Sequence, residues 1–463
     1  MNSVSSNDIR SKFSSAMSDM YKNEVPLYGD LLELVKDVNN ITLIKDTQLG
    51  QQLKNTGEES RLSLERHGAI RLGTANELKQ MCRVFAVMGM EPVGYYDLVP
   101  AGVPVHSTAF RATKVEDLNE SPFRIFTSLL RLELIQDDEL RQLAQQALNN
   151  RKIFSDQALV LTEKFEKQGA LSTEDAAQFV AEVLETFRWH TKAPVSKELY
   201  DSLHNQHRLI ADVVAFKGPH INHLTPRTLD IDMIQAGMAE RGITPKAIVE
   251  GPPPRKCPIL LRQTSFKALQ EDVTFNDEQG KQVGSHTARF GEIEQRGVAL
   301  TTKGRQLYDQ LLAKTRTAFG GIPTEHNATQ YMELLAKNFE EFPDSYEELR
   351  AKGLAYFHYF AQAHQDINIQ SVNEKNLEAL IEQGLITFEP IVYEDFLPVS
   401  AAGIFQSNLG ENGQNEYTEQ SNQDIFEQCL GRKVIDEITL YEQIQHQSLT
   451  RALAKLSQLE TCQ

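Results

Sequence analysis

The feature that most constrains the fold is an order of predicted elements that occurs twice along the chain. In the first stretch, a strand at 67–71 leads into a helix that Thr74 can cap, followed by a break at Pro92 and three strands. The second stretch repeats this order, with a helix beginning near Thr228 and a break at Pro245. The cap and the break are 18 residues apart in the first stretch and 17 in the second. We therefore predict a duplicated β-α-β-β-β module.

The predicted strands that follow each break are apolar-rich: 93–97, 103–112 and 123–134 in the first stretch, and 246–250, 258–269 and 286–296 in the second. We expect an α+β fold in which the two modules curl into one incomplete barrel, with helices around it. Five units follow from this: an N-terminal helical segment at 1–60, a first barrel module at 61–135, a helical insertion at 136–208, a second barrel module at 209–300 and a C-terminal helical region at 301–463.

Charge and composition exclude several classes of function. The formal net charge is −17, which argues against a nucleic-acid partner because phosphate binding needs a basic face. The sequence contains no stretch of about 18 apolar residues, so no membrane span is predicted, and the N-terminus lacks a signal-peptide pattern. The four cysteines show no pairing spacing, which is typical of a reducing compartment. We therefore expect a cytoplasmic protein; its oligomeric state is not predicted.

Common cofactor and peptidase motifs are also missing from the sequence. It contains no G-x-x-x-x-G-K-[ST] phosphate loop, no G-x-G-x-x-G after a strand, no H-E-x-x-H and no C-x-x-C. Nucleotide-driven chemistry, nicotinamide cofactors and common zinc-peptidase designs therefore have no support. The acidic chain can still bind an anionic small molecule. Salt screens charges beyond about 8–10 Å, so a nearby arginine attracts the substrate more than the distant acidic residues repel it.

Two histidines fall at the same place in the repeated order. His67 and His223 each lie on the first strand of a module, and a pseudo-twofold arrangement brings those strands together. A third ligand is expected on the strand 286–296, where alternation puts Glu292 and Glu294 on one face together with His286. A glutamate directed into a barrel is costly to bury unless it is paired or ligating.

Two histidines and one carboxylate with open positions are the arrangement of non-haem Fe(II) oxygenases, and a 2-oxo acid can chelate such an ion through its carboxylate and ketone. The alternative is structural: a duplicated histidine can be a satisfied core residue, and Glu292 and Glu294 can pair with Arg289 and Arg296. His220 is a weaker candidate than the histidine three residues later, because residues three apart on a strand face opposite ways.

A positively charged side chain accompanies the first histidine. His67 and Arg71 are four residues apart, so on a strand they point to the same side, roughly 13 Å apart at Cα. We expect Arg71 to bind a carboxylate at the far end of a short chelated substrate. The alternative is that Arg71 pairs with a local glutamate.

Five strings of this sequence resemble the bacterial 2-oxoadipate dioxygenase/decarboxylase family, also called 2-hydroxyglutarate synthase. They are Glu65–Arg71, Gly102–Phe110, Phe216–Pro226, Arg289–Gly297 and Phe396–Gly403. The resemblance extends from near Met20 to the C-terminal helices. It implies a fold similar to the vicinal oxygen chelate superfamily, Fe(II) as the cofactor, and conversion of 2-oxoadipate and O₂ to (R)-2-hydroxyglutarate and CO₂ in lysine catabolism.

The resemblance also implies roles for particular residues. The iron ligands are His67, His223 and a glutamate of the Gly-Glu-Ile-Glu string; Glu292 is preferred, although alternation does not separate it from Glu294. Arg71 matches the substrate-binding arginine. Val399 and Ser400 match a segment near 390–405 that closes over the substrate. Three further histidines are candidates for supporting the ligands from behind: His106, His220 and His286.

Two other functions stay open at this point. A metal-dependent isomerase or lyase on the same scaffold needs no oxygen and tolerates Zn²⁺ or Ni²⁺. A non-enzymatic acidic binding protein carries no stoichiometric metal, and its ligand binding is unchanged by His67→Ala.

Overall fold

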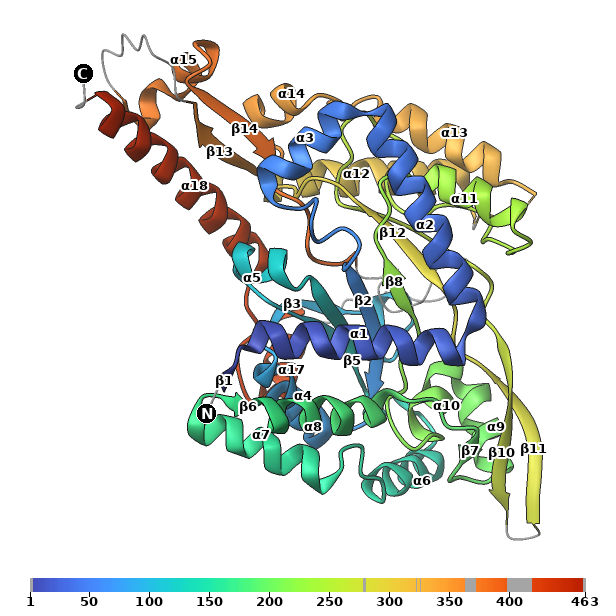
Figure 1. Cartoon of the computed structure of the whole chain (residues 1–463). Coiled ribbons are helices and arrows are strands. Elements are labelled where there is room, and N and C mark those ends of the chain that lie inside the picture. The colour runs from blue at the N-terminus through green and yellow to red at the C-terminus, as the bar shows by residue number, and fades with distance from the viewer. Residues whose placement is uncertain are drawn as a thin grey trace.

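The computed structural model describes residues 3–277, 280–321, 323–324, 326–362, 372–397 and 419–460. Over these residues the protein has strands at its centre and helices that cover them (Figure 1). The predicted α+β class is therefore confirmed. Among the described residues, no helix is both long and apolar enough to cross a membrane.

The largest sheet has five strands. They are β2 (Arg66–Leu72), β3 (Glu91–Asp97), β4 (Val105–Arg111), β5 (Phe123–Leu130) and β8 (Leu224–Pro226), in the spatial order β3-β4-β5-β2-β8. β2 pairs parallel with β5 and antiparallel with β8. Every residue of β4 and β5 is buried, so both faces of the sheet are covered, and α1 (Ser6–Glu24) lies across one of them (Figure 1).

Helix α4 (Ala75–Val87) connects β2 to β3 and begins at the expected cap. The Thr74 hydroxyl accepts a hydrogen bond from the Glu77 backbone N–H at 3.1 Å, and the Glu77 side chain accepts one from the Thr74 N–H, which completes a capping box. Pro92 does not form the expected break between the helix and the next strand, because it lies inside β3, opposite Phe110. β3 is an edge strand, where a residue without an N–H is tolerated.

A second, smaller sheet continues the arrangement beyond β8. It pairs β9 (Leu261–Ser265) with β12 (Glu292–Arg296) in antiparallel register, and helix α11 (Ile231–Glu240) precedes it in the chain. A parallel bridge between Arg227 and Glu294 joins the residue after β8 to β12. The edge of the five-stranded sheet formed by β8, with β2 beside it, therefore lies next to β12 of the smaller sheet.

The predicted strand at 246–250 is wrong as a continuous element. Only isolated bridges occur there, between Pro245 and Phe266 and between Glu250 and Gln263. From Pro245 to Glu250 the chain advances five residues, whereas from Phe266 to Gln263 the partner advances only three. The two segments therefore cannot form a regular ladder.

The predicted strand at 286–296 is also wrong in its extent, because it is two strands. β10 (Gln270–Asp277) and β11 (Gly280–Thr287) form a long hairpin that pairs with β7 (Lys192–Ala193), and His286 belongs to this hairpin. The chain then passes Gly291, where a Cβ atom would lie 2.1 Å from the Phe266 ring, before β12 begins. His286 therefore does not share a strand face with Glu292 and Glu294.

The remaining elements surround these sheets. The helices are α2 (Pro26–Lys45), α3 (Thr47–Thr56), α5 (Val115–Glu120), α6 (Asp138–Asn149), α7 (Asp156–Gln168), α8 (Thr173–Leu184), α9 (Lys197–Gln206), α10 (Arg208–Val214), α12 (Thr302–Phe319), α13 (Ala328–Phe339), α14 (Tyr346–Ala351), α15 (Leu377–Glu382), α17 (Glu419–Leu430) and α18 (Glu437–Glu460). The 3₁₀ turns are η1 (Val99–Ala101), η2 (Leu132–Leu134), η3 (Glu185–Phe187) and η4 (Glu374–Asn376). Two further two-stranded pairs join β1 (Ser3–Val4) to β6 (Leu171–Ser172), and β13 (Phe357–Ala361) to β14 (Ile386–Pro390).

Three large apolar clusters divide the core of the described residues. One contains the buried faces of α1, α2, α4 and α8 against the five-stranded sheet, with Phe13, Phe85 and Phe123 fully buried. A second contains buried residues of α6, α9 and α10 together with residues of β4, β5 and β10. The third lies between α12, α13, α18 and the β13-β14 pair. The candidate site described next contacts the first cluster through Phe290 and the second through Phe396.

Candidate metal centre

The structure brings His67, His223 and Glu292 together in the interior. Their ligand-type atoms all lie within 4.8 Å of one another, and all three residues are buried. His67 is on β2 opposite Thr225 of β8, so that His223, one residue before β8, comes beside it. The two imidazole rings are perpendicular, with centroids 5.4 Å apart. Glu292, the first residue of β12, completes the group.

One oxygen of Glu292 is surrounded by partners and the other is not. Oε1 lies 3.1 Å from His67 Nε2, and it accepts hydrogen bonds from Thr225 Oγ1 at 3.1 Å and from Gln263 Nε2 at 2.9 Å. Glu292 Oε2 and both ring nitrogens of His223 are buried without a hydrogen-bond partner among the described residues. Because buried polar atoms are costly to leave unsatisfied, this donor set fits a cation bound between the three residues.

The protonation states favoured by the surroundings also fit a metal. Burial lowers the pKa of His223 to about 4, so its ring is neutral near pH 7. Burial acts to raise the pKa of Glu292, but His223 and His67 outweigh it and the pKa is lowered. A neutral imidazole and an ionised carboxylate are the forms that bind metals.

Glu294 contacts the other side of His67. Its Oε2 lies 2.9 Å from His67 Nδ1, while Arg296 binds the same carboxylate through two hydrogen bonds of 2.7 and 2.9 Å. Burial opposes ionisation of Glu294, but Arg296 and His67 lower its pKa to about 2. For His67, burial opposes protonation, and the two glutamates nonetheless raise the pKa. The arrangement is the one in which a carboxylate orients a metal-binding imidazole from behind.

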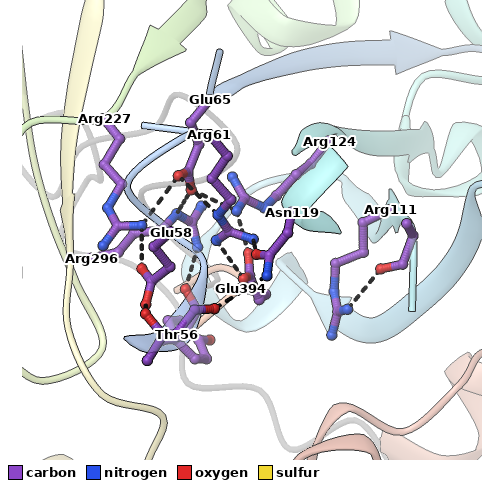
Figure 2. A network of polar contacts seen from close by, with 12 residues as sticks. Thr56, Glu58, Arg61, Glu65, Arg111, Asn119, Arg124, Arg227, Arg296 and Glu394 are labelled. Atoms are coloured by element: carbon purple, nitrogen blue, oxygen red, sulfur yellow. Dashed lines mark hydrogen bonds and ion pairs between the residues drawn. The ribbon is translucent and has the colours of Figure 1, made fainter. Parts of the chain in front are cut away.

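Behind Glu294 lies a buried network of opposite charges, shown in Figure 2. Glu65 is at its centre, with Arg124 at 2.7 Å, Arg227 at 3.2 Å and Arg61 at 3.6 Å. Arg61 and Arg124 also contact Glu394, from the chain that follows β14. The charges of the network are mutually compensated, so it can hold Glu294 ionised without contact with water.

Aromatic rings pack against both histidines. The ring of Phe396 is 4.9 Å from that of His67, and the ring of Phe290 is 4.9 Å from that of His223. Arg296 lies over Phe396 at 5.5 Å. These contacts limit the rotation of the imidazoles and keep the centre apolar on two sides.

Among the described residues, the ion-pair partner found for Arg71 is an aspartate distant in sequence rather than a local glutamate. Its Nη1 lies 2.6 Å from Oδ2 of Asp212, in α10, 141 residues away in sequence. Asp212 in turn contacts His286 and His220. Two of the three supporting histidines therefore lie behind Arg71 rather than behind the candidate ligands.

The third histidine, His106, lies away from the candidate centre. His106, on β4, packs against Phe426 of α17 with ring centroids 4.7 Å apart, and it has no polar contact with the candidate centre among the described residues. Val399 and Ser400 lie outside the described residues, although Phe396, three positions earlier, contacts His67.

Gln263, Thr225, Asp212 and the charged network were not predicted from the sequence. One signal was available for Asp212, which is the only charged residue in the apolar run Leu209–Val214. A carboxylate in such a run requires a buried partner. No comparable signal identifies Gln263, because it lies on β9 and meets Glu292 only through the pairing of β9 with β12.

The fold and this site define an α+β protein with a buried candidate metal centre of two histidines and one carboxylate. Comparison with known proteins specifies the family. The model of the 2-oxoadipate dioxygenase/decarboxylase family matches residues 13–408, and the chain belongs to that family.

Individual relatives are similar over nearly their whole length. A 2-oxoadipate dioxygenase/decarboxylase of Pseudomonas putida is 61% identical over 450 residues, covering 96% of each chain. One from Escherichia coli is 54% identical over 97% of this chain and 99% of the relative. The crystal structure of a hydroxyglutarate synthase from Pseudomonas putida in complex with 2-oxoadipate has 58% identity and a TM-score of 0.91, covering 98% of this chain and 100% of that one.

Proposed function

We propose that this protein is an Fe(II)-dependent dioxygenase/decarboxylase that converts 2-oxoadipate and O₂ to (R)-2-hydroxyglutarate and CO₂, a step of lysine degradation. The observation that carries the proposal is the buried convergence of His67, His223 and Glu292. Family membership supports the substrate class, because relatives with more than half of their residues identical carry the name of this activity. The reaction balances because one oxygen atom of O₂ enters the new carboxylate at the former 2-oxo carbon and the other enters the new hydroxyl group, while the released CO₂ keeps the two oxygen atoms of the original carboxylate.

The proposed iron ligands are one nitrogen from each of His67 and His223 and one oxygen of Glu292. Fe(II) held by two histidines and a carboxylate supplies open coordination positions and redox chemistry toward dioxygen. Within the protein, Glu294 would accept a hydrogen bond from Nδ1–H of His67 and so favour the tautomer whose Nε2 is free to ligate. Thr225 and Gln263 would hold Glu292 in place through its Oε1, which leaves Oε2 for the metal.

Arg71 is proposed to bind the distal carboxylate of the substrate. It lies on the same strand as His67, four residues along, and its charge contributes to the low pKa of His223, behind burial. A substrate bound at the metal through its 2-oxo acid end could thus extend along β2 toward the guanidinium. Val399 and Ser400 are proposed to close over it. Holding both ends of the substrate limits rotation about the bonds at its reacting carbon.

We further propose that the two strand sets are duplicated modules of an incomplete, vicinal-oxygen-chelate-like barrel. The strand orders support this duplication. One set has the order β3-β4-β5-β2, and the other has the order β8, β12, β9 and the bridged segment at 245–250. In both sets the first strand of the module is next to the last, and the two first strands, β2 and β8, pair with each other. This arrangement accounts for why the two candidate histidines meet.

The test is oxygen uptake by anaerobically reconstituted Fe(II) protein given 2-oxoadipate, with analysis of the products. We expect oxygen consumption matched by CO₂ and 2-hydroxyglutarate, and no reaction with Zn²⁺ in place of iron. His67→Ala and His223→Ala should lose both bound iron and turnover. His446→Ala is the matched control, because His446 is exposed and its contact, Glu374, is 4.0 Å away.

Other outcomes would overturn the proposal. Product formation without oxygen, or equal activity with Zn²⁺, would identify an isomerase or lyase on this scaffold. Absence of stoichiometric metal binding, with ligand binding unchanged by His67→Ala, would instead identify a non-enzymatic binding protein.

A further inference from the structure

Asp212 is a buried carboxylate that contacts three side chains from three different parts of the chain. Its Oδ2 lies 2.6 Å from Arg71 Nη1 of β2. Its Oδ1 lies 2.8 Å from Nε2 of His286, on β11, and 3.3 Å from Nε2 of His220, in the segment before β8. Only about 5% of the Asp212 side chain is exposed. Its position in α10, between apolar residues, makes these contacts unavoidable.

Asp212, His220 and His286 have the composition of a metal site, but their contacts differ from those of the centre at His67. At that centre, several buried ligand atoms have no hydrogen-bond partner among the residues that the structure describes. None of the nitrogen or oxygen atoms of Asp212, His220 and His286 is among the buried atoms without a partner in the described part of the chain. Nδ1 of His286 is 2.8 Å from the Tyr200 hydroxyl, and Arg71 already contacts Asp212. The group is therefore a self-satisfied hydrogen-bond network.

This network restricts the guanidinium of Arg71. An arginine side chain has about 2 kcal/mol of rotamer entropy to lose, and a partner that fixes it beforehand spares the substrate that cost. Asp212 is itself held on both oxygens, by Arg71 on one side and by the two histidines on the other. Trp189 packs its ring on both histidines, 4.6 Å from His220 and 5.9 Å from His286. The support behind Arg71 is thus rigid.

We propose that Asp212 is a positioning residue that orients Arg71 toward the distal carboxylate of the substrate, and so sets the preference for 2-oxo dicarboxylates over 2-oxo monocarboxylates. His220 and His286 act through it by holding its carboxylate in place. The inference rests on the proposed function, because it requires Arg71 to bind the end of the substrate remote from the metal. The inference names a specific cause for the selectivity, which is the ion pair between Asp212 and Arg71 that forms before the substrate binds.

The test compares 2-oxoadipate with 2-oxohexanoate, which has the same chain length and no distal carboxylate. In the iron-loaded enzyme, Asp212→Asn should raise KM for 2-oxoadipate by about tenfold or more, with a smaller change in kcat, because misplacement of a binding group weakens capture. Both constants for 2-oxohexanoate should stay within about twofold of wild type. Asp201→Asn is the matched control, because Asp201 is a half-exposed carboxylate of the neighbouring helix α9 that pairs only with Lys197 in the described part of the chain. It should change neither substrate's constants.

A binding measurement gives a readout independent of turnover. Under anaerobic conditions, calorimetry of the iron-loaded protein should show the same loss of affinity for 2-oxoadipate in Asp212→Asn and no loss for 2-oxohexanoate. Asp212→Glu, which keeps the charge, should recover part of the preference. If Asp212→Asn does not fold, His286→Gln serves in its place, with an expected two- to threefold loss confined to the dicarboxylate.

The outcomes separate this inference from the proposed function. If the wild-type protein has no preference for the dicarboxylate, the proposed function and the inference both fail. If the wild type prefers 2-oxoadipate and Asp212→Asn keeps that preference, the inference alone is wrong. Equal losses for both substrates would also contradict it, because they would indicate a general structural role.

Discussion

Glu292 and Glu294, two residues apart on β12, contact opposite ring nitrogens of the same histidine. Glu292 lies 3.1 Å from Nε2 of His67, and Glu294 lies 2.9 Å from Nδ1. Glu292 has a buried oxygen without a partner among the described residues, whereas Arg296 binds both oxygens of Glu294. The two carboxylates therefore have different tasks, the first facing the candidate metal and the second facing a cation of the protein.

Removing each of these charges should affect metal binding to different degrees. We expect Glu292→Gln to abolish stoichiometric Fe(II) binding, because a ligand is lost. Glu294→Gln should retain binding with an affinity lowered about 10- to 100-fold, the usual effect of removing a group that orients a ligand. The Fe(II) affinity of each variant is measured as its metal content after dialysis at fixed concentrations of free Fe(II). The reverse order of effects would show that Glu294 is the ligand.

Substitution of Arg71 should affect substrate capture more than the metal. A charge-assisted pair contributes about 1.5–3 kcal/mol, so Arg71→Ala should raise KM for 2-oxoadipate roughly 10- to 100-fold. Its iron content should equal that of wild type. Arg83→Ala is the control, because Arg83 forms a partly exposed pair with Glu166. Unchanged KM in Arg71→Ala would remove this residue from the substrate site.

The charged network behind Glu294 should be important for stability. Glu65 is fully buried among Arg61, Arg124 and Arg227 (Figure 2). Glu65→Gln leaves these cations without their central counter-charge, and breaking a buried pair in this way costs about 3–5 kcal/mol. Urea unfolding of the metal-free protein measures the change. Glu166→Gln, which removes an exposed pair, should cost at most about 1 kcal/mol; equal effects would contradict the prediction.

His106 should make the protein sensitive to acid. Burial, with a smaller contribution from Arg131, lowers its pKa from 6.5 to about 3. Between these values the unfolded chain binds a proton that the folded chain does not, so the stability present above pH 6.5 is lost as the pH falls. From pH 6.5 to 5 the loss is about 2 kcal/mol, at 1.36 kcal/mol per pH unit.

The matched variant is His106→Gln, which has no charge to gain. The difference in unfolding free energy between wild type and variant should narrow by about that amount over the same range. A constant difference from pH 6.5 to 5 would mean that the folded protein accommodates a protonated His106.

Much of the fold followed from local patterns. Thr74 caps α4 through a capping box, as its position before a helical run predicts. The prediction failed where a pattern depended on pairing partners. The segment at 246–250 has strand-like composition, yet its bridges to β9 are out of step. The stretch at 286–296 alternates as one strand, yet the chain leaves the hairpin before Gly291 and begins β12 after it.

By itself, the sequence predicted that His67 and His223 occupy equivalent places in a repeated order of elements, because that prediction depends only on local periodicity and helix caps. The different surroundings of Glu292 and Glu294 are visible only in the tertiary structure. Alternation places both on one face of β12, and which of them meets a free ligand position depends on where β12 lies against β2 and β8. The contact between Arg71 and Asp212 likewise could not be predicted from the sequence, because the two residues are 141 positions apart and meet only through tertiary packing.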